Sequence, residues 1–158
     1  MERSFLSRSL LETHRLGERF VKFIPTGTTV ALTGTLGAGK TAFVQGVGIA
    51  SGITKNSITS PTFVLCNEYV GTHSIYHLDA YRLVDSDEFL ELGPEELYHS
   101  KHYVFIEWAD RVINCLPREY ITINIHIEDP DSRLFVVNST DALKQYVTMW
   151  MDSVYREV

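Results

Sequence analysis

The chain has 158 residues, of which 44% are hydrophobic and 22% are charged, a composition that excludes a disordered or fibrous protein. Its formal net charge is -6, whereas proteins that bind nucleic acid on their own usually carry a surplus of basic residues. No apolar run approaches the ~20 residues needed to span a bilayer, and the first residues do not resemble a signal peptide. Cys66 and Cys115 are too few for a disulfide framework and are expected to be buried. We therefore expect one cytoplasmic domain, residues 1–158, with no role at a membrane.

The N-terminal part of the chain predicts a helix, a strand and a second helix. Ser9 and Glu12 have the spacing of a capping box, and apolar residues recur at helical spacing up to residue 24. Residues 28–33 form a β-branched run that is typical of a buried strand. A glycine-rich turn then leads into a helix predicted from Lys40 to Ala50.

The rest of the chain predicts two hairpins, one isolated strand and several helices. The extended segments are 62–70, 73–79, 103–108, 120–127 and 133–138, and the helical segments are 86–92, 95–98, 109–116 and a last helix capped by Thr140 or Asp141. In that last helix, Trp150 and Met151 belong to an apolar stripe that we assign to the core. Because strand–helix crossovers alternate with hairpins, we expect a three-layer α/β domain whose mixed sheet has a parallel centre and antiparallel hairpin additions.

The glycine-rich turn carries the most specific chemical signal. Residues 34–41, Gly-Thr-Leu-Gly-Ala-Gly-Lys-Thr, match G-x-x-x-x-G-K-[ST], the Walker A or P-loop pattern. Glycines let successive N–H groups point at phosphate oxygens, and the following helix presents its positive end to the same phosphates. Lys40 is expected to reach the β- and γ-phosphates, and the Thr41 hydroxyl to ligate Mg²⁺. With a strand before it and a helix after it, the motif predicts a P-loop nucleotide-binding domain.

Two carboxylates are candidates for the metal and for the attacking water. Asp79 and Glu107 each end an apolar strand-like run, so both should emerge at the edge of the sheet where ligands bind. One could hold Mg²⁺ through its water shell, and the other could orient or deprotonate water. Spacing alone does not decide which residue has which role.

Other residues near these acids permit both a structural and a functional interpretation. Ser60-Pro61-Thr62 lies where P-loop switches often place a threonine that senses the γ-phosphate, although for this motif taken alone a simple turn is favoured. His77 shares the face of Asp79 on its strand, and a structural role is favoured. For Arg82 and Arg111, surface ion pairing is favoured over contact with phosphate.

Several motifs together resemble the TsaE (YjeE) family, the small bacterial ATPase of tRNA threonylcarbamoyladenosine biosynthesis. They are Gly34-Thr-Leu-Gly-Ala-Gly-Lys-Thr41, Ser60-Pro-Thr62, Glu68-Tyr69, His77-Leu-Asp-Ala-Tyr-Arg-Leu83 and Ile106-Glu-Trp108. The resemblance implies a Mg²⁺-dependent ATP-binding and hydrolysing protein that is slow alone and assists a TsaB–TsaD complex. That complex transfers a threonylcarbamoyl group to the adenosine beside the anticodon, so tRNA would be reached indirectly, and the ligands would be ATP or ADP with Mg²⁺.

The resemblance also implies roles for individual residues. Thr41 and Glu107 would ligate Mg²⁺, Asp79 would be the Walker B-type acid near the metal, and Trp108 would support the site. The catalytic residues would be Glu107, Asp79 and Lys40. The nucleotide would be contacted by Gly34, Leu36, Gly37, Ala38, Gly39, Lys40, Thr41, Ala42, Thr62, Thr13 and Arg133. Ser60 and Thr62 would form a switch-like loop. The chain departs from the family at Thr35, Ala42 and Ala80, and none of these departures removes a phosphate or metal ligand.

Three other functions compete with this interpretation. A small-molecule kinase would need arginines in a lid, and between Thr41 and Pro117 the chain has only Arg82 and Arg111. A GTPase is disfavoured because no Asn-Lys-x-Asp sequence occurs. A non-catalytic nucleotide-dependent scaffold stays open.

Overall fold

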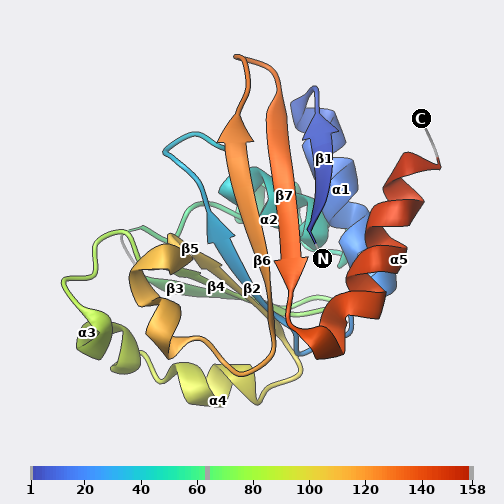
Figure 1. Ribbon diagram of the computed structural model, residues 1–158. Helices are drawn as coiled ribbons and strands as arrows, with labels where there is room; N and C mark the ends of the chain where they lie inside the picture. Colours follow the sequence, from blue (N-terminus) through green and yellow to red (C-terminus); the bar gives the residue numbers. More distant parts are fainter. Residues whose placement is uncertain (1, 63–64, 157–158) are drawn as a thin grey trace.

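The computed structural model describes residues 2–62 and 65–156, which build a sheet of seven strands with helices on both faces (Figure 1). The strands are β1 (Arg3–Ser7), β2 (Thr29–Thr33), β3 (Cys66–Tyr69), β4 (Ile75–Asp79), β5 (Tyr103–Glu107), β6 (Tyr120–Ile127) and β7 (Arg133–Ser139), in the spatial order β1-β7-β6-β2-β5-β4-β3. The pairs β4–β5, β5–β2 and β2–β6 are parallel, and the pairs toward both edges are antiparallel. The predicted α/β class with a parallel centre is therefore confirmed.

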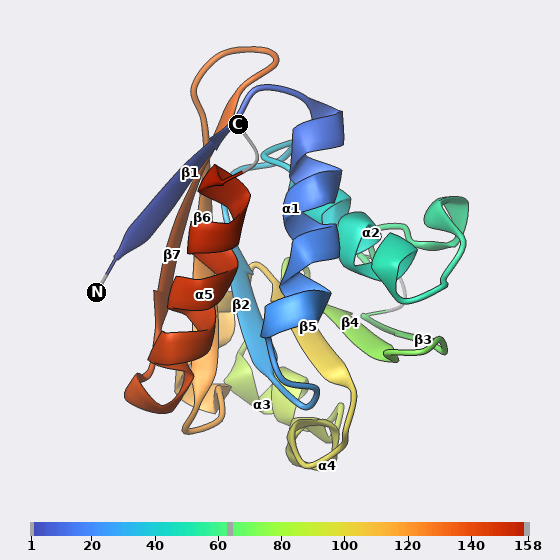
Figure 2. The ribbon, with the colours of Figure 1, turned by 90° about the vertical axis from the view of Figure 1, so that its right-hand side faces the viewer.

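The helices form the two outer layers. The α-helices are α1 (Leu10–Phe23), α2 (Lys40–Ala50), α3 (Ser86–Leu90), α4 (Pro94–Tyr98) and α5 (Lys144–Tyr155), and the 3₁₀ segments are η1 (Lys55–Ser57), η2 (Ala109–Cys115) and η3 (Asp141–Leu143). Figure 2 shows α1, α2 and α5 on one face of the sheet, with α3 and α4 near its lower end. Within residues 2–62 and 65–156, every helix is too short or too polar to cross a membrane.

The main core lies between the sheet and the layer of α1, α2 and α5. Ser9 begins α1 as predicted, because its side chain accepts the N–H of Glu12 at 3.1 Å. Phe20 packs edge-on against Phe43 and Trp150, with ring centroids 5.8 and 5.2 Å apart. The indole N–H of Trp150 donates to the carbonyl of Leu16 at 3.1 Å. The predicted core stripe of the last helix is therefore confirmed, and α2 rests on a rigid aromatic layer.

The sequence did not predict the first strand. β1 pairs antiparallel with β7, with Phe5 opposite Phe135. Phe5 and Ser7 are buried while Ser4 is exposed, so the strand alternates, but it is short and lacks β-branched residues. Its stability comes from a partner that lies far away in the sequence, which a local pattern cannot reveal.

Four local predictions were wrong. The extended segment 62–70 forms a strand only from Cys66, because Leu65 is left-handed with φ of 65°; residues 63–64 lie outside the described part. Segment 109–116 is a 3₁₀ stretch broken at Val112, which has non-helical backbone angles. Thr140 does not cap the last helix with its side chain; instead its hydroxyl accepts the N–H of Tyr120 at 3.2 Å. Cys66 and Cys115 are half-buried thiols.

Candidate active site

Three parallel strands bring the expected residues to one edge of the sheet. The P-loop follows β2, Glu107 ends β5, and Asp79 ends β4. In the registers of these strands, Leu32 lies opposite Glu107, and Glu107 lies opposite Asp79. The carboxyl ends of neighbouring parallel strands share one edge, so the loop and both carboxylates meet there.

The P-loop adopts a curled backbone that only glycine accommodates at two positions. Gly34 has φ of 146°, and a Cβ there would lie 2.7 Å from the carbonyl oxygen of Ile125. Gly39 has φ of 111° and precedes the first turn of α2. The turn therefore delivers the N-terminus of α2, with its unpaired N–H groups, to the edge that carries the carboxylates.

Lys40 is buried and donates its hydrogen bonds within its own loop. The ammonium donates to the carbonyls of Gly34 at 2.7 Å and Thr35 at 3.0 Å. It also lies over the Trp108 ring, 4.2 Å from the centroid. Burial lowers the pKa of Lys40, although the charge of Glu107 opposes this effect. The loop carbonyls and the indole therefore hold the cation where phosphate oxygens are expected.

Glu107 is held between a helix and a strand. The Thr41 hydroxyl lies 3.1 and 3.0 Å from its two carboxylate oxygens. On the other side, Nε2 of His77 lies 2.6 Å from Oε2. The Glu107 and His77 side chains are 4% and 0% exposed, so this carboxylate has little access to water and depends on these partners.

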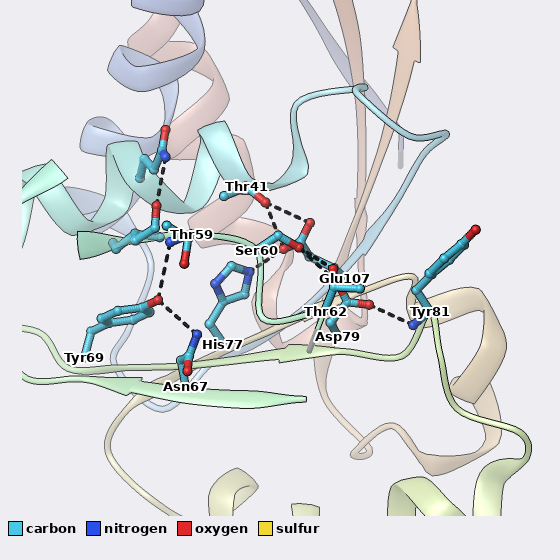
Figure 3. Close-up of polar contacts among 12 residues, drawn as sticks. Thr41, Thr59, Ser60, Thr62, Asn67, Tyr69, His77, Asp79, Tyr81 and Glu107 are labelled. Atoms are coloured by element: carbon cyan, nitrogen blue, oxygen red, sulfur yellow. Dashed lines mark hydrogen bonds and ion pairs between the residues drawn. The ribbon is translucent and has the colours of Figure 1, made fainter. Parts of the chain in front are cut away.

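Asp79 is held mainly by a loop. Its Oδ2 accepts hydrogen bonds from the Thr62 hydroxyl at 2.9 Å and the Ser60 hydroxyl at 3.2 Å, and Oδ1 accepts the N–H of Tyr81 at 2.8 Å. Figure 3 shows Ser60 and Thr62 above Asp79, with Glu107 and Thr41 beside them. Ser60 and Thr62, which the resemblance implied to form a switch-like loop, thus contact Asp79 directly.

Two further contacts fix the segment that leads into this loop. The Gln45 amide of α2 donates to the carbonyl of Ile58 at 2.9 Å. The N–H of Thr59 donates to the Tyr69 hydroxyl at 3.4 Å, as Figure 3 shows. The segment is therefore tied to α2 at one end and to Asp79 at the other.

The expected nucleotide contacts other than Gly34 lie around two adjoining pockets. The first, of about 280 Å³, is lined by Leu36, Gly37, Ala38, Gly39, Lys40, Thr41, Ala42, Ser60, Thr62, Tyr81, Glu107 and Trp108. The second, of about 430 Å³, is lined by Arg8, Ser9, Leu10, Thr13, Gly37, Gly39, Ala42, Pro130, Asp131 and Arg133. They share two P-loop glycines, Gly37 and Gly39, and the adjoining Ala42, so one elongated ligand could occupy both. Arg133 joins the second pocket to the loop by donating to the Gly37 carbonyl at 3.3 Å.

The donor set of the first pocket fits a hard cation bound together with a phosphate ligand. Thr41 and Glu107, which line the pocket, and Asp79, which lies behind Ser60 and Thr62, offer oxygen atoms only, which suits Mg²⁺. In the described part of the chain, no cluster of three or more His, Cys, Asp and Glu side chains could enclose a metal. Mg²⁺ usually binds through one or two carboxylates plus substrate phosphates, and this sparse donor set matches that preference.

Some residues at the site were not singled out by the sequence as ligand contacts. Tyr81 lines the first pocket, and Arg8 and Asp131 line the second. Arg111, expected in a surface ion pair, donates to the Tyr81 carbonyl at 2.6 Å and stacks over the Tyr81 ring. His77, for which a structural role was favoured, contacts a site carboxylate. In the sequence, the position of His77 two residues before Asp79, on the same face of the strand, was the only sign that it could lie at the site.

Known proteins similar to this chain share one description. A family model described as "Threonylcarbamoyl adenosine biosynthesis protein TsaE" matches residues 7–135. The tRNA threonylcarbamoyladenosine biosynthesis protein TsaE of Treponema pallidum (strain Nichols) is 38% identical over 122 residues, 77% of this chain and 90% of that protein. The protein of the same name from Bacillus subtilis (strain 168) is 37% identical over 123 residues, 77% of this chain and 76% of that protein. The crystal structure of Bacillus subtilis YdiB gives a TM-score of 0.77 at 26% identity, covering 99% of this chain and 96% of that one.

Proposed function

The chain belongs to the TsaE family of threonylcarbamoyl adenosine biosynthesis proteins, and from that premise we propose that it is a Mg²⁺-dependent ATPase. We infer that it acts on a TsaB–TsaD complex, which modifies the adenosine beside the anticodon, and that it reaches tRNA through that complex. The formal net charge of -6 supports an indirect route, because a protein that binds RNA alone usually carries a basic surplus.

The observation that carries this proposal is the contact between Thr41 and Glu107 at the start of α2. The P-loop threonine and a strand-end carboxylate lie 3.0 Å apart, a pair of oxygen donors suited to Mg²⁺ beside nucleotide phosphates. Mg²⁺ bound there would neutralise charge on the β- and γ-phosphates. Asp79 is buried behind Ser60 and Thr62, which line the same pocket and donate to its carboxylate, and it is our candidate for orienting the attacking water.

We attribute slow turnover by the lone chain to the bonds that these groups already make. Two of the three N–H groups of Lys40 already donate to the carbonyls of Gly34 and Thr35, so full engagement with phosphate oxygens would exchange these bonds. Asp79 accepts from Ser60, Thr62 and the Tyr81 backbone, so three of the about four acceptor sites of its carboxylate are already used. A protein partner that favours the rearranged state would raise the rate.

The structure favours hydrolysis over transfer of phosphate to a metabolite. A kinase lid needs mobile arginines, whereas Arg111 is tied to the backbone of Tyr81. The non-catalytic scaffold is the alternative that needs an experiment.

The test reconstitutes the purified chain with TsaB and TsaD, tRNA, ATP and Mg²⁺, and follows ATP hydrolysis and tRNA modification together. We expect slow hydrolysis by the chain alone and stimulation on the order of tenfold by the partners, within the usual range of coupling between sites. Lys40→Ala should abolish both activities, while Lys101→Ala, a change at an exposed lysine, should leave them unchanged. If Glu107→Ala and Asp79→Ala retain full tRNA modification while still binding ATP, the chain is a scaffold and the ATPase proposal is wrong.

A further inference from the structure

His77 is a fully buried histidine whose polar contact is with an active-site carboxylate. Its Nε2 lies 2.6 Å from Oε2 of Glu107, and its Nδ1 has no hydrogen-bond partner among the described residues. A neutral imidazole carries its hydrogen on one nitrogen and a lone pair on the other. With the hydrogen on Nδ1, an N–H donor would be buried without an acceptor and a lone pair would face a carboxylate. The hydrogen therefore belongs on Nε2, which donates to Glu107.

The sheet register explains why these two side chains meet. On the paired strands β4 and β5, His77 lies opposite Phe105, and Asp79 lies opposite Glu107. His77 and Glu107 are thus diagonal neighbours on one face, within reach of each other when both side chains are long. Figure 3 shows the His77 ring below Thr41. Its position is fixed by two strands and not by a loop.

This arrangement does not match a histidine that serves packing alone. A core histidine that only fills space would be expected to satisfy both nitrogens or to be replaced by an apolar side chain, because an unpaired buried polar atom is unfavourable. Here one nitrogen has no partner while the other makes a short bond to Glu107. The same carboxylate also meets the Thr41 hydroxyl, which lies 3.1 Å from Oε1 and 3.0 Å from Oε2.

We propose that His77 is a positioning residue that acts through Glu107. Its Nε2–H fixes the carboxylate so that the oxygens face Thr41, and this orientation sets the affinity of the nucleotide complex for a divalent cation. The inference rests on the proposed function of Thr41 and Glu107 as Mg²⁺ donors. Groups that orient a metal ligand in this manner change metal affinity by ~10–100-fold when they are removed.

The test compares His77→Leu, which removes the donor, with His77→Gln, whose side-chain amide can replace Nε2–H. Binding of Mn²⁺ to the full chain is measured by electron paramagnetic resonance in the presence of a non-hydrolysable ATP analogue. We expect His77→Leu to weaken Mn²⁺ binding by ~10–100-fold and His77→Gln to recover most of it. Affinity for the analogue in EDTA should change by less than about threefold, because His77 lies outside both nucleotide pockets.

His102 supplies a matched control. Its Nε2 also meets a carboxylate, Glu68, at 3.1 Å, but that pair lies away from the P-loop pockets. His102→Leu should therefore bind Mn²⁺ as the unmodified chain does. If His77→Leu does not fold, His77→Asn replaces it, because the shorter amide cannot reach Oε2 of Glu107.

Two results would overturn the inference. Unchanged Mn²⁺ affinity in His77→Leu or His77→Asn would show that Glu107 needs no support. Equal losses in His77→Gln and His77→Leu, accompanied by equal losses of thermal stability, would assign His77 to packing. Failure of the proposed function looks different: the unmodified chain would then not bind Mn²⁺ with the analogue at all.

Discussion

Asp79 and Glu107 lie opposite each other on neighbouring strands, but different kinds of structure hold them. Glu107 is fixed by Thr41 on α2 and by His77 on β4, both in regular elements. Asp79 is held by the hydroxyls of Ser60 and Thr62, which belong to a loop. Equivalent positions in the sheet therefore do not have equivalent support: Glu107 contacts side chains of regular elements, whereas Asp79 contacts side chains of a loop.

From this difference we propose which carboxylate has which of the two roles that the sequence spacing left open. A metal donor benefits from a fixed position, because binding then requires no reorganisation. A group that must change partners during the cycle benefits from attachment to a loop, because loops rearrange at lower cost than strands. We therefore propose that Glu107 is the metal donor and that Asp79 orients the attacking water.

The largest effect is expected from Glu107→Gln. The amide oxygen can still accept from His77, so the fold should persist, but the charge that attracts Mg²⁺ is lost. A bound metal stabilises the transition state by several kcal/mol, so its loss should lower the rate of single-turnover hydrolysis on the order of 10³-fold. Titration calorimetry with ATP in EDTA should give unchanged binding. If the variant keeps normal Mg²⁺ dependence, Glu107 is not a Mg²⁺ donor, and the proposed difference in role between Glu107 and Asp79 is wrong.

Asp79→Asn should reduce hydrolysis less and in a different way. Loss of a group that orients or deprotonates water typically costs ~10²–10⁴-fold in rate, and we expect the lower end of that range because water can still enter the pocket. Mn²⁺ affinity should stay near that of the unmodified chain. An equal loss of Mn²⁺ affinity in Asp79→Asn and Glu107→Gln would mean that both carboxylates serve the metal.

The sequence predicted the meeting of these residues because each step follows a local or topological rule. The P-loop pattern marks the loop, apolar runs mark the strands, and parallel pairing brings Asp79 and Glu107 to one edge. The partner of each carboxylate could not be predicted. The His77 contact depends on the register of β4 against β5, which α3 and α4 separate in the sequence. The edge strand β1 was missed for a similar reason, because β7 stabilises it from the far end of the chain.

The smallest and most specific effect is expected from Thr62→Val, which keeps the shape of the side chain and removes its bond to Asp79. The change also removes the bond between the Thr62 and Ser60 hydroxyls, 2.8 Å long. Loss of these partly exposed bonds should raise local opening by roughly tenfold, or about 1.4 kcal/mol. Hydrogen exchange of the amides in residues 58–62 measures this change. Ser60→Ala should have less effect, because its bond to Asp79 is longer, 3.2 Å against 2.9 Å.

Thr59→Val is the matched control for this loop, because Thr59 contacts Tyr69 through its backbone N–H and Figure 3 draws no bond from its hydroxyl to Asp79. Exchange in this control should match the unmodified chain. Because Glu107 is held by separate elements, Mn²⁺ affinity should stay constant in all three loop variants. If Thr62→Val instead weakens Mn²⁺ binding as His77→Leu does, the loop supports the metal side as well, and the two carboxylates form one unit.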